Sequence, residues 1–275
     1  MYRFLRFPDY KYKAVTLSCD DDTVHNRRLI SVLDEYGLKC TFNLNSEMYA
    51  KESGGRILTE DEATNLFKNS PHEVAIHGAK HRSLAEVPAE AAIRDIIVDR
   101  ENLEKQFGRI VKGMAYANGS YDDNVVEILK YCGISYARTC VATNKFDIPT
   151  DWLRMPTTCH HTAKNLDELT DKFLLEKEVD YYWANSPKLF YMWGHAYEFN
   201  DNDNWEIIEN FAKKIGKRDD IWYCTNGELY DYCKAYERLE YSVDGKIIRN
   251  PTNKDIYLSY YNKNVLVKAC GSIKI

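Results

Sequence analysis

Three consecutive aspartates near the start of the chain form its most reactive stretch. Asp20, Asp21 and Asp22 come directly after an apolar run at residues 14–17, and a pattern of helical period begins at Thr23. This order predicts a buried strand that carries carboxylates at its C-terminal end, with a helix after it. Adjacent carboxylates repel one another, so we expect a metal ion, an arginine or a helix N-terminus beside them. The alternative is that Asp22 caps the helix and the other two are solvated.

Two histidines four residues apart offer a set of metal ligands. His77 ends an apolar segment, and His81 follows it in the sequence His-Gly-Ala-Lys-His. On a helical turn the two imidazoles would lie on one face and could bind one ion. With a strand-end aspartate they make a two-histidine, one-carboxylate set, which suits a divalent metal with open positions for water and substrate. The alternative is a pair of surface histidines.

A further histidine ends another apolar run. His195 follows Tyr191-Met192-Trp193-Gly194, so it is either a functional group at a strand end or a core histidine bonded to the backbone. His160 and His161 have no such placement at a strand end, and we interpret them as structural.

The elements that must position these groups alternate along the chain. Strands are expected at residues 14–19, 39–44, 73–76, 111–117, 134–138, 153–155, 189–193 and 221–224. Helices are expected at residues 23–36, 59–68, 88–107, 122–132, 165–177, 204–215 and 227–236. About seven alternations predict an α/β fold of βα units around a parallel sheet, closed into a barrel. Chemistry in such barrels lies at the C-terminal strand ends, where this chain has Asp20, Asp21, His77, Asn118, Arg154 and His195.

The pattern changes after Tyr236. Asp244-Gly245 within residues 241–249 indicates a hairpin turn, and residues 257–269 are predicted to form two strands around Asn262-Lys263-Asn264. We therefore expect a barrel domain at residues 1–236 and a small β appendage at residues 237–275.

Composition limits the class of protein. The 275 residues are enough for one barrel-sized domain, and 44% hydrophobic with 29% charged residues is typical of a globular protein. With a formal net charge of −5, neither nucleic acid nor an anionic membrane is expected as a partner. Eight cysteines without CxxC pairs, and no signal-peptide core or apolar window of transmembrane length, predict a reduced, cytoplasmic protein. A chain cleaved from its leader would look the same, and the sequence does not indicate an oligomeric state.

Taken in order, these motifs resemble the five motifs of the NodB-homology polysaccharide deacetylases, carbohydrate esterase family four. The resemblance covers roughly residues 10–235, and the first, second and fifth motifs are the specific ones. The matching segments are Leu17-Ser18-Cys19-Asp20-Asp21-Asp22, His77-x-x-x-His81, Ala115-Tyr116-Ala117-Asn118-Gly119-Ser120-Tyr121, Leu153-Arg154 and His195.

The resemblance implies a distorted (β/α)7 barrel that removes acetyl groups from N- or O-acetylated sugars with the help of a divalent metal, commonly zinc. By position, Asp20 would be the general base and His195 the acid that protonates the leaving atom. The backbone N–H of Asn118 would complete the oxyanion hole. The positions matched to the metal ligands are Asp21, His77 and His81.

The chain departs from the family pattern in two motifs. Asp22 stands where the first motif usually has glycine, and Ala115 and Ala117-Asn118 stand where the third usually has arginine and Pro-Tyr. Asp20 therefore lacks its usual arginine, and we expect Arg154 to replace it through a bidentate bond. The alternative is a surface Arg154 paired with Asp151.

Two further functions remain open at this point. One is hydrolysis of a non-sugar C–N bond, as in the allantoinase-like relatives, and the other is a non-catalytic barrel that binds carbohydrate. Retention of the acids and histidines of all the specific motifs argues against a barrel that has lost turnover. An acetylated carbohydrate is accordingly the expected substrate and partner.

Overall fold

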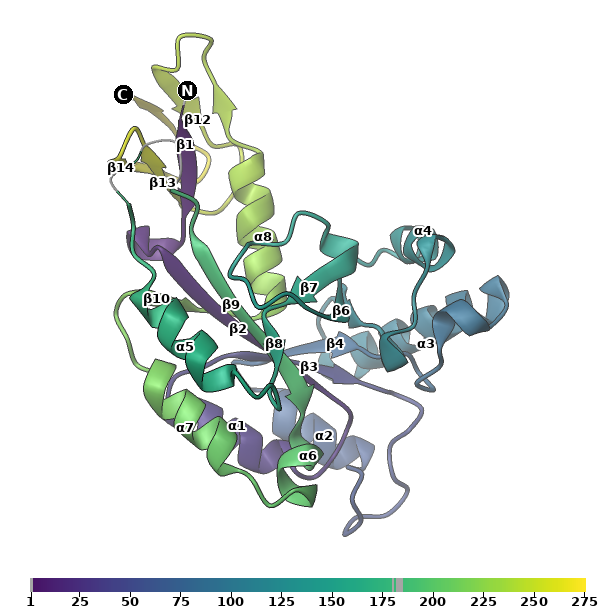
Figure 1. Ribbon diagram of the computed structural model, residues 1–275. Coiled ribbons are helices and arrows are strands. Elements are labelled where there is room, and N and C mark those ends of the chain that lie inside the picture. The colour runs from purple at the N-terminus through teal and green to yellow at the C-terminus, as the bar shows by residue number, and fades with distance from the viewer. Residues whose placement is uncertain (1, 180, 182–184) are drawn as a thin grey trace.

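A ring of parallel strands forms the centre of the molecule, which the computed structural model describes at residues 2–179, 181 and 185–275. The strands lie in the order β7-β6-β5-β4-β3-β2-β9-β8, and β10 pairs with the start of β2 (Figure 1). Their bounds are β2 Lys13–Asp20, β3 Cys40–Leu44, β4 Glu73–Ile76, β5 Gly113–Ala115, β6 Tyr136–Ala142, β7 Met155–Thr157, β8 Cys159–His160, β9 Lys188–His195 and β10 Ile221–Tyr223.

One short segment closes the ring. In β7, Met155 and Thr157 pair with β6, and two residues later β8 pairs with β9. The N–H of Thr158, between the two strands, donates to the carbonyl of Tyr191 at 2.8 Å. Counting β7 and β8 as one bridging strand and leaving out β10, the described residues form a seven-membered ring. The predicted distorted (β/α)7 barrel is confirmed.

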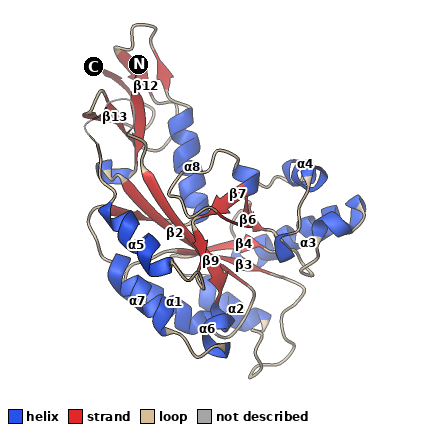
Figure 2. Cartoon of the chain, in the orientation of Figure 1, coloured by secondary structure: helices blue, strands red, loops and turns tan. Residues whose placement is uncertain are grey.

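Helices cover the outside of this ring (Figure 2). Thr59 and Thr225 each begin a helix with a capping box, in which the hydroxyl accepts from the third helical N–H and a glutamate reaches back. The bounds are α1 Asn26–Glu35, α2 Glu60–Phe67, α3 Ala89–Phe107, α4 Asp123–Tyr131, α5 Leu166–Leu175, α6 Ala196–Asp201, α7 Glu206–Ile215 and α8 Asn226–Glu237.

Local boundaries differ from the prediction at several places, three of which concern residues near the site. The first helix begins at Asn26 instead of Thr23, so Asp22 does not cap it. Residues 152–154 form a 3-10 helix, and the strand expected at 153–155 begins only at Met155. His160 ends β8, a strand too short to be seen in the sequence, so the interpretation that it lies at no strand end is wrong.

The C-terminal residues form two small antiparallel sheets (Figure 1). The first joins β11 Glu240–Tyr241, β12 Ile247–Arg249 and β15 Ser272–Lys274; the second joins β13 Ile256–Tyr260, β14 Lys263–Val267 and the first strand of the chain, β1 Arg3–Arg6. Both predicted hairpins are present. The pairing of β1 with β13 was not expected, and it places both ends of the chain in the appendage.

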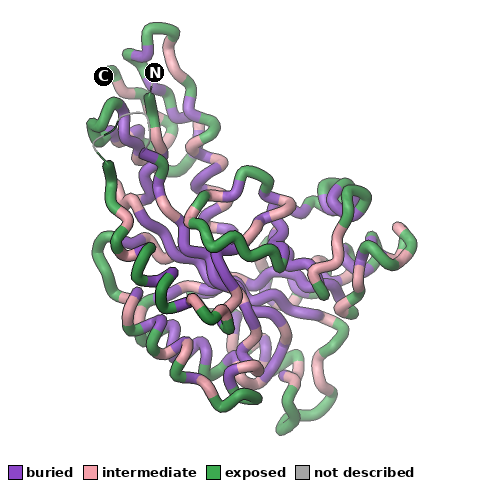
Figure 3. Tube along the Cα trace, viewed as in Figure 1, coloured by how far each residue is buried: buried purple, intermediate pink, exposed green. Residues whose placement is uncertain are grey.

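Barrel and appendage share a hydrophobic core. Ala14 and Leu189, near the starts of β2 and β9, pack in one cluster with Leu229 of α8 and with Ile256 and Leu258 of β13. Figure 3 shows buried chain continuing from the barrel strands towards the appendage. All eight cysteines are free. In the described part of the chain, no helix has the length and apolarity that a membrane span requires.

This shared core generates a prediction about stability. Leu258 is 0% exposed, so Leu258→Ala is expected to lower the free energy of unfolding by about 2–5 kcal/mol. Val243→Ala, at a fully exposed position, should change it by less than about 0.5 kcal/mol. Urea unfolding followed by circular dichroism and tryptophan fluorescence should show one transition in both variants. An appendage that unfolds first, while the fluorescence stays native, would contradict the shared core.

Candidate active site

The C-terminal ends of neighbouring strands bring most of the predicted site residues together. Asp20, the last residue of β2, is in register with Asn43 of β3 on one side and with His195 of β9 on the other. His77 directly follows β4, and Asn118 lies in the 3-10 helix just after β5. The alternation of strands and helices in the sequence therefore predicted the end of the barrel at which these side chains lie.

Asp20 lies among positive and polar groups in the barrel interior. It is 2% exposed, its Oδ1 accepts from Asn43 Nδ2 at 2.8 Å, and its Oδ2 pairs with Arg138. Oδ2 also lies 3.7 Å from His77 Nε2 and 3.9 Å from His195 Nε2. Burial raises the pKa of Asp20, but the charge of Arg138, with a smaller contribution from His195, outweighs burial, and the pKa is about 2. Asp20 is therefore ionised, and able to accept a proton, at neutral pH.

The arginine beside Asp20 is Arg138, which corrects the expectation for Arg154. Arg138 is fully buried on β6, and its guanidinium also lies over the Trp193 ring, 4.2 Å from the centroid. The Arg154 guanidinium is instead bonded to Asp151 at 2.8 Å and to Asp123 at 2.5 Å. The cause is the 3-10 turn at residues 152–154, which ends before β7 begins, so Arg154 does not extend from a strand into the barrel.

Three of the predicted site residues have a left-handed backbone. The φ angle is 71° at Asp21, 52° at His81 and 57° at Asn118. Such conformations cost about 1–3 kcal/mol in residues other than glycine, and they persist where the surroundings fix them. Asp21 is fixed on both sides, because its N–H donates to the Asn43 carbonyl at 3.1 Å and its carbonyl accepts from Asn26 Nδ2 at 2.8 Å. Backbone strain is thus present at three of the residues that converge on the site.

Asp21, His77 and His81 form a group that could hold a metal ion. One ligand atom from each lies within 4.8 Å of the other two, and His81 Nε2 is 3.8 Å from Asp21 Oδ1. His81 reaches this position through a turn at Gly78, whose φ is 85°, so the predicted helical arrangement of the two histidines is wrong.

The chemistry of this donor set fits a divalent ion. His77 Nδ1 lies 2.8 Å from the carbonyl oxygen of Ala115, an acceptor that fixes the proton on Nδ1 and leaves the Nε2 lone pair for a metal. Burial lowers the pKa of His77, which keeps the ring neutral as a ligand must be. Two imidazoles and one carboxylate leave further coordination positions open.

Asp22 differs from its two neighbours because it is buried without a cation. Its Oδ2 accepts from the Asn45 N–H at 2.9 Å, and its Oδ1 has no hydrogen-bond partner among the described residues. Burial raises the pKa of Asp22 well above its usual range, which favours the neutral acid. The third carboxylate therefore adds less negative charge to the site than the sequence suggested.

His195 lies beside Asp20 on the neighbouring strand, β9. Its Nε2 is directed at Asp20, and its Nδ1 lies 3.1 Å from Glu198 Oε2. Burial lowers the pKa of His195, but the hydrogen bond to Glu198 and the charge of Asp20 outweigh it and raise the pKa above the ordinary value. The ring can accordingly carry a proton towards the centre of the site.

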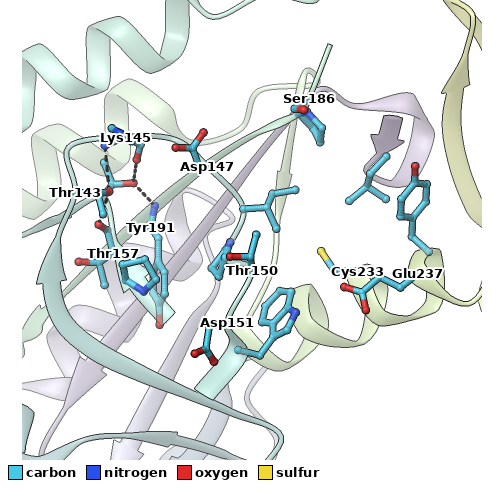
Figure 4. Close-up of a pocket in the computed structure, with 18 of the residues that line it drawn as sticks. Thr143, Lys145, Asp147, Thr150, Asp151, Thr157, Ser186, Tyr191, Cys233 and Glu237 are labelled. Carbon is cyan, nitrogen blue, oxygen red and sulfur yellow. Dashed lines mark hydrogen bonds between the residues drawn. The ribbon is translucent and has the colours of Figure 1, made fainter. Parts of the chain in front are cut away.

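Two cavities differ in which of the predicted site residues line them. One of about 370 Å³ opens directly over the site, lined by Asp21, Asp22, Thr23, Asn45, Met48, Arg56, Ile57, His81 and Tyr197. The other, of about 970 Å³, lies between the segment 143–158 and α8, and Arg154 lines it. Figure 4 shows Thr143, Lys145 and Asp147 on one side of the larger cavity and Cys233 and Glu237 on the other. The smaller hollow is the one that leads to the acids and histidines.

Three residues of the site escaped the sequence reasoning. Arg138 is the last residue of the strand predicted at residues 134–138, so its position at a strand end is visible in the sequence. Asn43 looked like one more residue of a β-forming segment, and only its pairing opposite Asp20 reveals its role. Glu198 stands one helical turn after His195, in a helix that was not predicted.

Comparison with known proteins gives one family match. Residues 8–137 match the family model described as polysaccharide deacetylase. No curated protein matches the chain.

Solved structures resemble the chain at low sequence identity. A candidate polysaccharide deacetylase from Mycobacterium smegmatis is 15% identical, with 85% of this chain and 94% of that one covered and a TM-score of 0.59. A family 4 acetyl xylan esterase from Clostridium thermocellum, in complex with cobalt, is 16% identical. The match covers 80% of this chain and 91% of that one, with a TM-score of 0.50. The Streptococcus pyogenes deacetylase PplD, in complex with acetate, is 18% identical, with a TM-score of 0.42. The match covers 46% of this chain and 55% of that one, so the chain spans about half the length of that protein.

The donor geometry generates a prediction about metal content. The full chain is expected to bind one zinc or cobalt ion, and His81→Ala or Asp21→Asn should each abolish binding, because each removes one of three ligands. His25→Ala, which removes a histidine outside the group, should leave the stoichiometry unchanged. Metal analysis after dialysis measures the result. An ion retained at full stoichiometry in both ligand variants would refute the assignment.

Proposed function

We propose that this protein is a metal-dependent hydrolase that removes acetyl groups from N- or O-acetylated sugars. The observation that carries the proposal is the convergence of Asp20, held ionised by Arg138, with His195 and the metal-binding group at one end of the barrel. The family of residues 8–137 supports the same reaction class. The hollow of about 370 Å³ over the site has space for part of a glycan chain.

Each side chain has a place in the reaction. A divalent ion, zinc or a similar metal, would supply Lewis-acid polarisation of the acetyl carbonyl and activation of water when bound by Asp21, His77 and His81. Asp20 takes one proton from the attacking water, whose oxygen forms the new bond to the acetyl carbon. The backbone N–H of Asn118 stabilises the developing oxyanion.

The bond from the acetyl carbon to the sugar nitrogen or oxygen then breaks, and His195 donates a proton from Nε2 to the leaving atom. The proton on Asp20 then passes through solvent to Nε2 of His195, which returns both side chains to their starting states. One water is consumed, and the free amine or alcohol is released with acetic acid, which ionises to acetate. A separate acid is needed because an amine is a poor leaving group until it is protonated.

The experiment that tests this function is acetate release. The metal-loaded chain is expected to release acetate from a chitin tetrasaccharide, an acetylated xylan oligosaccharide or another acetylated glycan of a panel, and chelation should abolish the release. Hydrolysis of allantoin without acetate release would favour a non-sugar amidohydrolase. Metal binding with no hydrolysis of any member would favour a carbohydrate-binding barrel.

Asp20→Asn should separate base catalysis from metal binding. An amide cannot accept the proton, so kcat should fall about 10²-fold or more, while the metal stays bound to the three residues that remain. Asp34→Asn on α1, the same substitution outside the site, is the control. Unchanged turnover in Asp20→Asn would reassign the base.

A second prediction distinguishes the role of Arg138 from that of Arg154. Arg138→Met is expected to reduce kcat about 10- to 100-fold, because it removes a hydrogen bond between charged groups from Asp20. The acidic limb of the pH–rate profile should move to higher pH, since the charge that holds the pKa of Asp20 at about 2 is gone.

Arg154→Met is the matched comparison, because its ion pairs involve exposed aspartates. Here we expect an unchanged pH–rate profile and a stability change within about 0.5 kcal/mol. Thermal unfolding confirms that both variants are folded at the assay temperature. The reverse result, with the shift in Arg154→Met alone, would restore the assignment made from the sequence.

A further inference from the structure

Three histidines converge on one carboxylate oxygen beside the site. Glu198 lies on α6, one turn after His195. Its Oε2 is 2.6 Å from His161 Nε2, 3.1 Å from His195 Nδ1 and 3.3 Å from His160 Nε2. Neither the family match, which ends at residue 137, nor the sequence motifs include Glu198, His160 or His161.

We propose that Glu198, itself held by His160 and His161, is the positioning residue that orients His195 for proton donation. The carboxylate accepts the Nδ1 proton of His195, which leaves Nε2 directed at the centre of the site, 3.9 Å from Asp20 Oδ2. This inference rests on the proposed deacetylation, because it gives His195 its orientation as the acid of that reaction.

The proton positions support a hydrogen-bonded cluster. The backbone N–H of Thr162 donates to His160 Nδ1 at 3.2 Å, so Nδ1 is an acceptor and the proton of the ring is on Nε2, towards Glu198. His161 Nε2 is within hydrogen-bond distance of the same oxygen. Burial raises the pKa of Glu198, but the hydrogen bonds from His160, His161 and His195 outweigh it and keep the group ionised.

Distances distinguish this cluster from the proposed metal site. His81 Nε2 and Asp21 Oδ1 are 3.8 Å apart, too far for a hydrogen bond and compatible with an ion between them. Around Glu198 the separations of 2.6–3.3 Å are those of direct hydrogen bonds. His160 also directs its proton, not a lone pair, at the centre of the cluster. These separations fit a group that holds a side chain in place by hydrogen bonds, although the same three residues lie close enough together to be considered as metal ligands.

The cluster is tied to the strand that carries His195. His160 pairs with Trp193 between β8 and β9, and the N–H of His161 donates to the Trp193 carbonyl at 2.9 Å. His161 is 2% exposed and packs on Gly194, where a Cβ would lie 1.7 Å from its Cδ2. A glycine immediately before His195 is thus required for the imidazole of His161 to lie beneath that strand. His161 and His195 consequently keep one relative position.

The fixed orientation has a chemical consequence for the leaving group. After His195 gives up its Nε2 proton, the neutral ring retains the proton on Nδ1, and this is the tautomer that Glu198 stabilises. A wrong tautomer or a rotated ring would impair the step in which the leaving nitrogen is protonated. Substrates with a leaving group that needs no proton should not require Glu198.

Kinetics with two kinds of substrate test this role. Glu198→Gln is expected to lower kcat on a chitin tetrasaccharide about 10²-fold, with KM nearly unchanged, and to leave hydrolysis of para-nitrophenyl acetate within about threefold of the wild type. Glu198→Asp keeps the charge and should retain more of the amide activity. The double variant Glu198→Gln/His195→Ala should be no slower than His195→Ala, because both residues act in one step.

Glu209→Gln is the matched control, since Glu209 is an exposed glutamate on α7 that pairs with Arg28. It should leave both activities unchanged. Equal losses of Glu198→Gln on both substrates, or losses that add to those of His195→Ala, would overturn the positioning role.

A second measurement does not depend on turnover. Long-range 15N NMR of the histidine rings, with His195 assigned from the signals lost in His195→Ala, is expected to show the Nδ1–H tautomer in the wild type. Glu198→Gln should populate the Nε2–H tautomer. An unchanged tautomer would overturn the proposal even in an active enzyme, whereas the expected change in a chain inactive on every substrate would refute only the deacetylase function. A second bound zinc that disappears in Glu198→Gln would show a metal site instead.

Discussion

The candidate site depends on a buried ion pair between two strands that are not neighbours. Asp20 ends β2, Arg138 lies on β6, and three strands, β5, β4 and β3, separate the two along the sheet. The guanidinium therefore reaches the carboxylate across the interior of the ring, and the contact forms only when the ring is closed. Both partners are almost fully buried, and removal of one partner from such a pair typically costs about 3–5 kcal/mol. The same contact thus links closure of the barrel to the charge state of Asp20.

The three consecutive aspartates have different environments because each meets a different surface. Asp20 faces the interior and its arginine, Asp21 lies at the mouth beside His81, and Asp22 is buried under the Asn45 backbone. A left-handed residue in the middle, Asp21 with φ 71°, lets successive side chains diverge. Repulsion within the run is reduced by this divergence and by burial that favours the neutral form of Asp22.

Stability and chemistry are placed at opposite ends of the strands. The starts of β2 and β9 pack with the appendage, while their ends carry Asp20 and His195. In parallel barrels the C-terminal ends carry the reactive groups and the N-terminal ends contribute to stability. The appendage and β1 therefore complete the stable end of the barrel, and the hollow over Asp21 and His81 opens at the other end.

The sequence by itself determined the alternation of strands and helices, the barrel, both C-terminal hairpins and the strand-end position of Asp20, His77 and His195. These follow from local periodicity, turn residues and the rule that parallel strands end on one face. The tertiary structure decided the arginine partner of Asp20, the closure by β7 and β8, the pairing of β1 and the histidines around Glu198. Arg138 and Arg154 look alike in the sequence, since both follow short apolar segments. Only the fold shows that one points across the barrel while the other pairs with exposed aspartates, because contacts between residues far apart in the chain leave no local pattern.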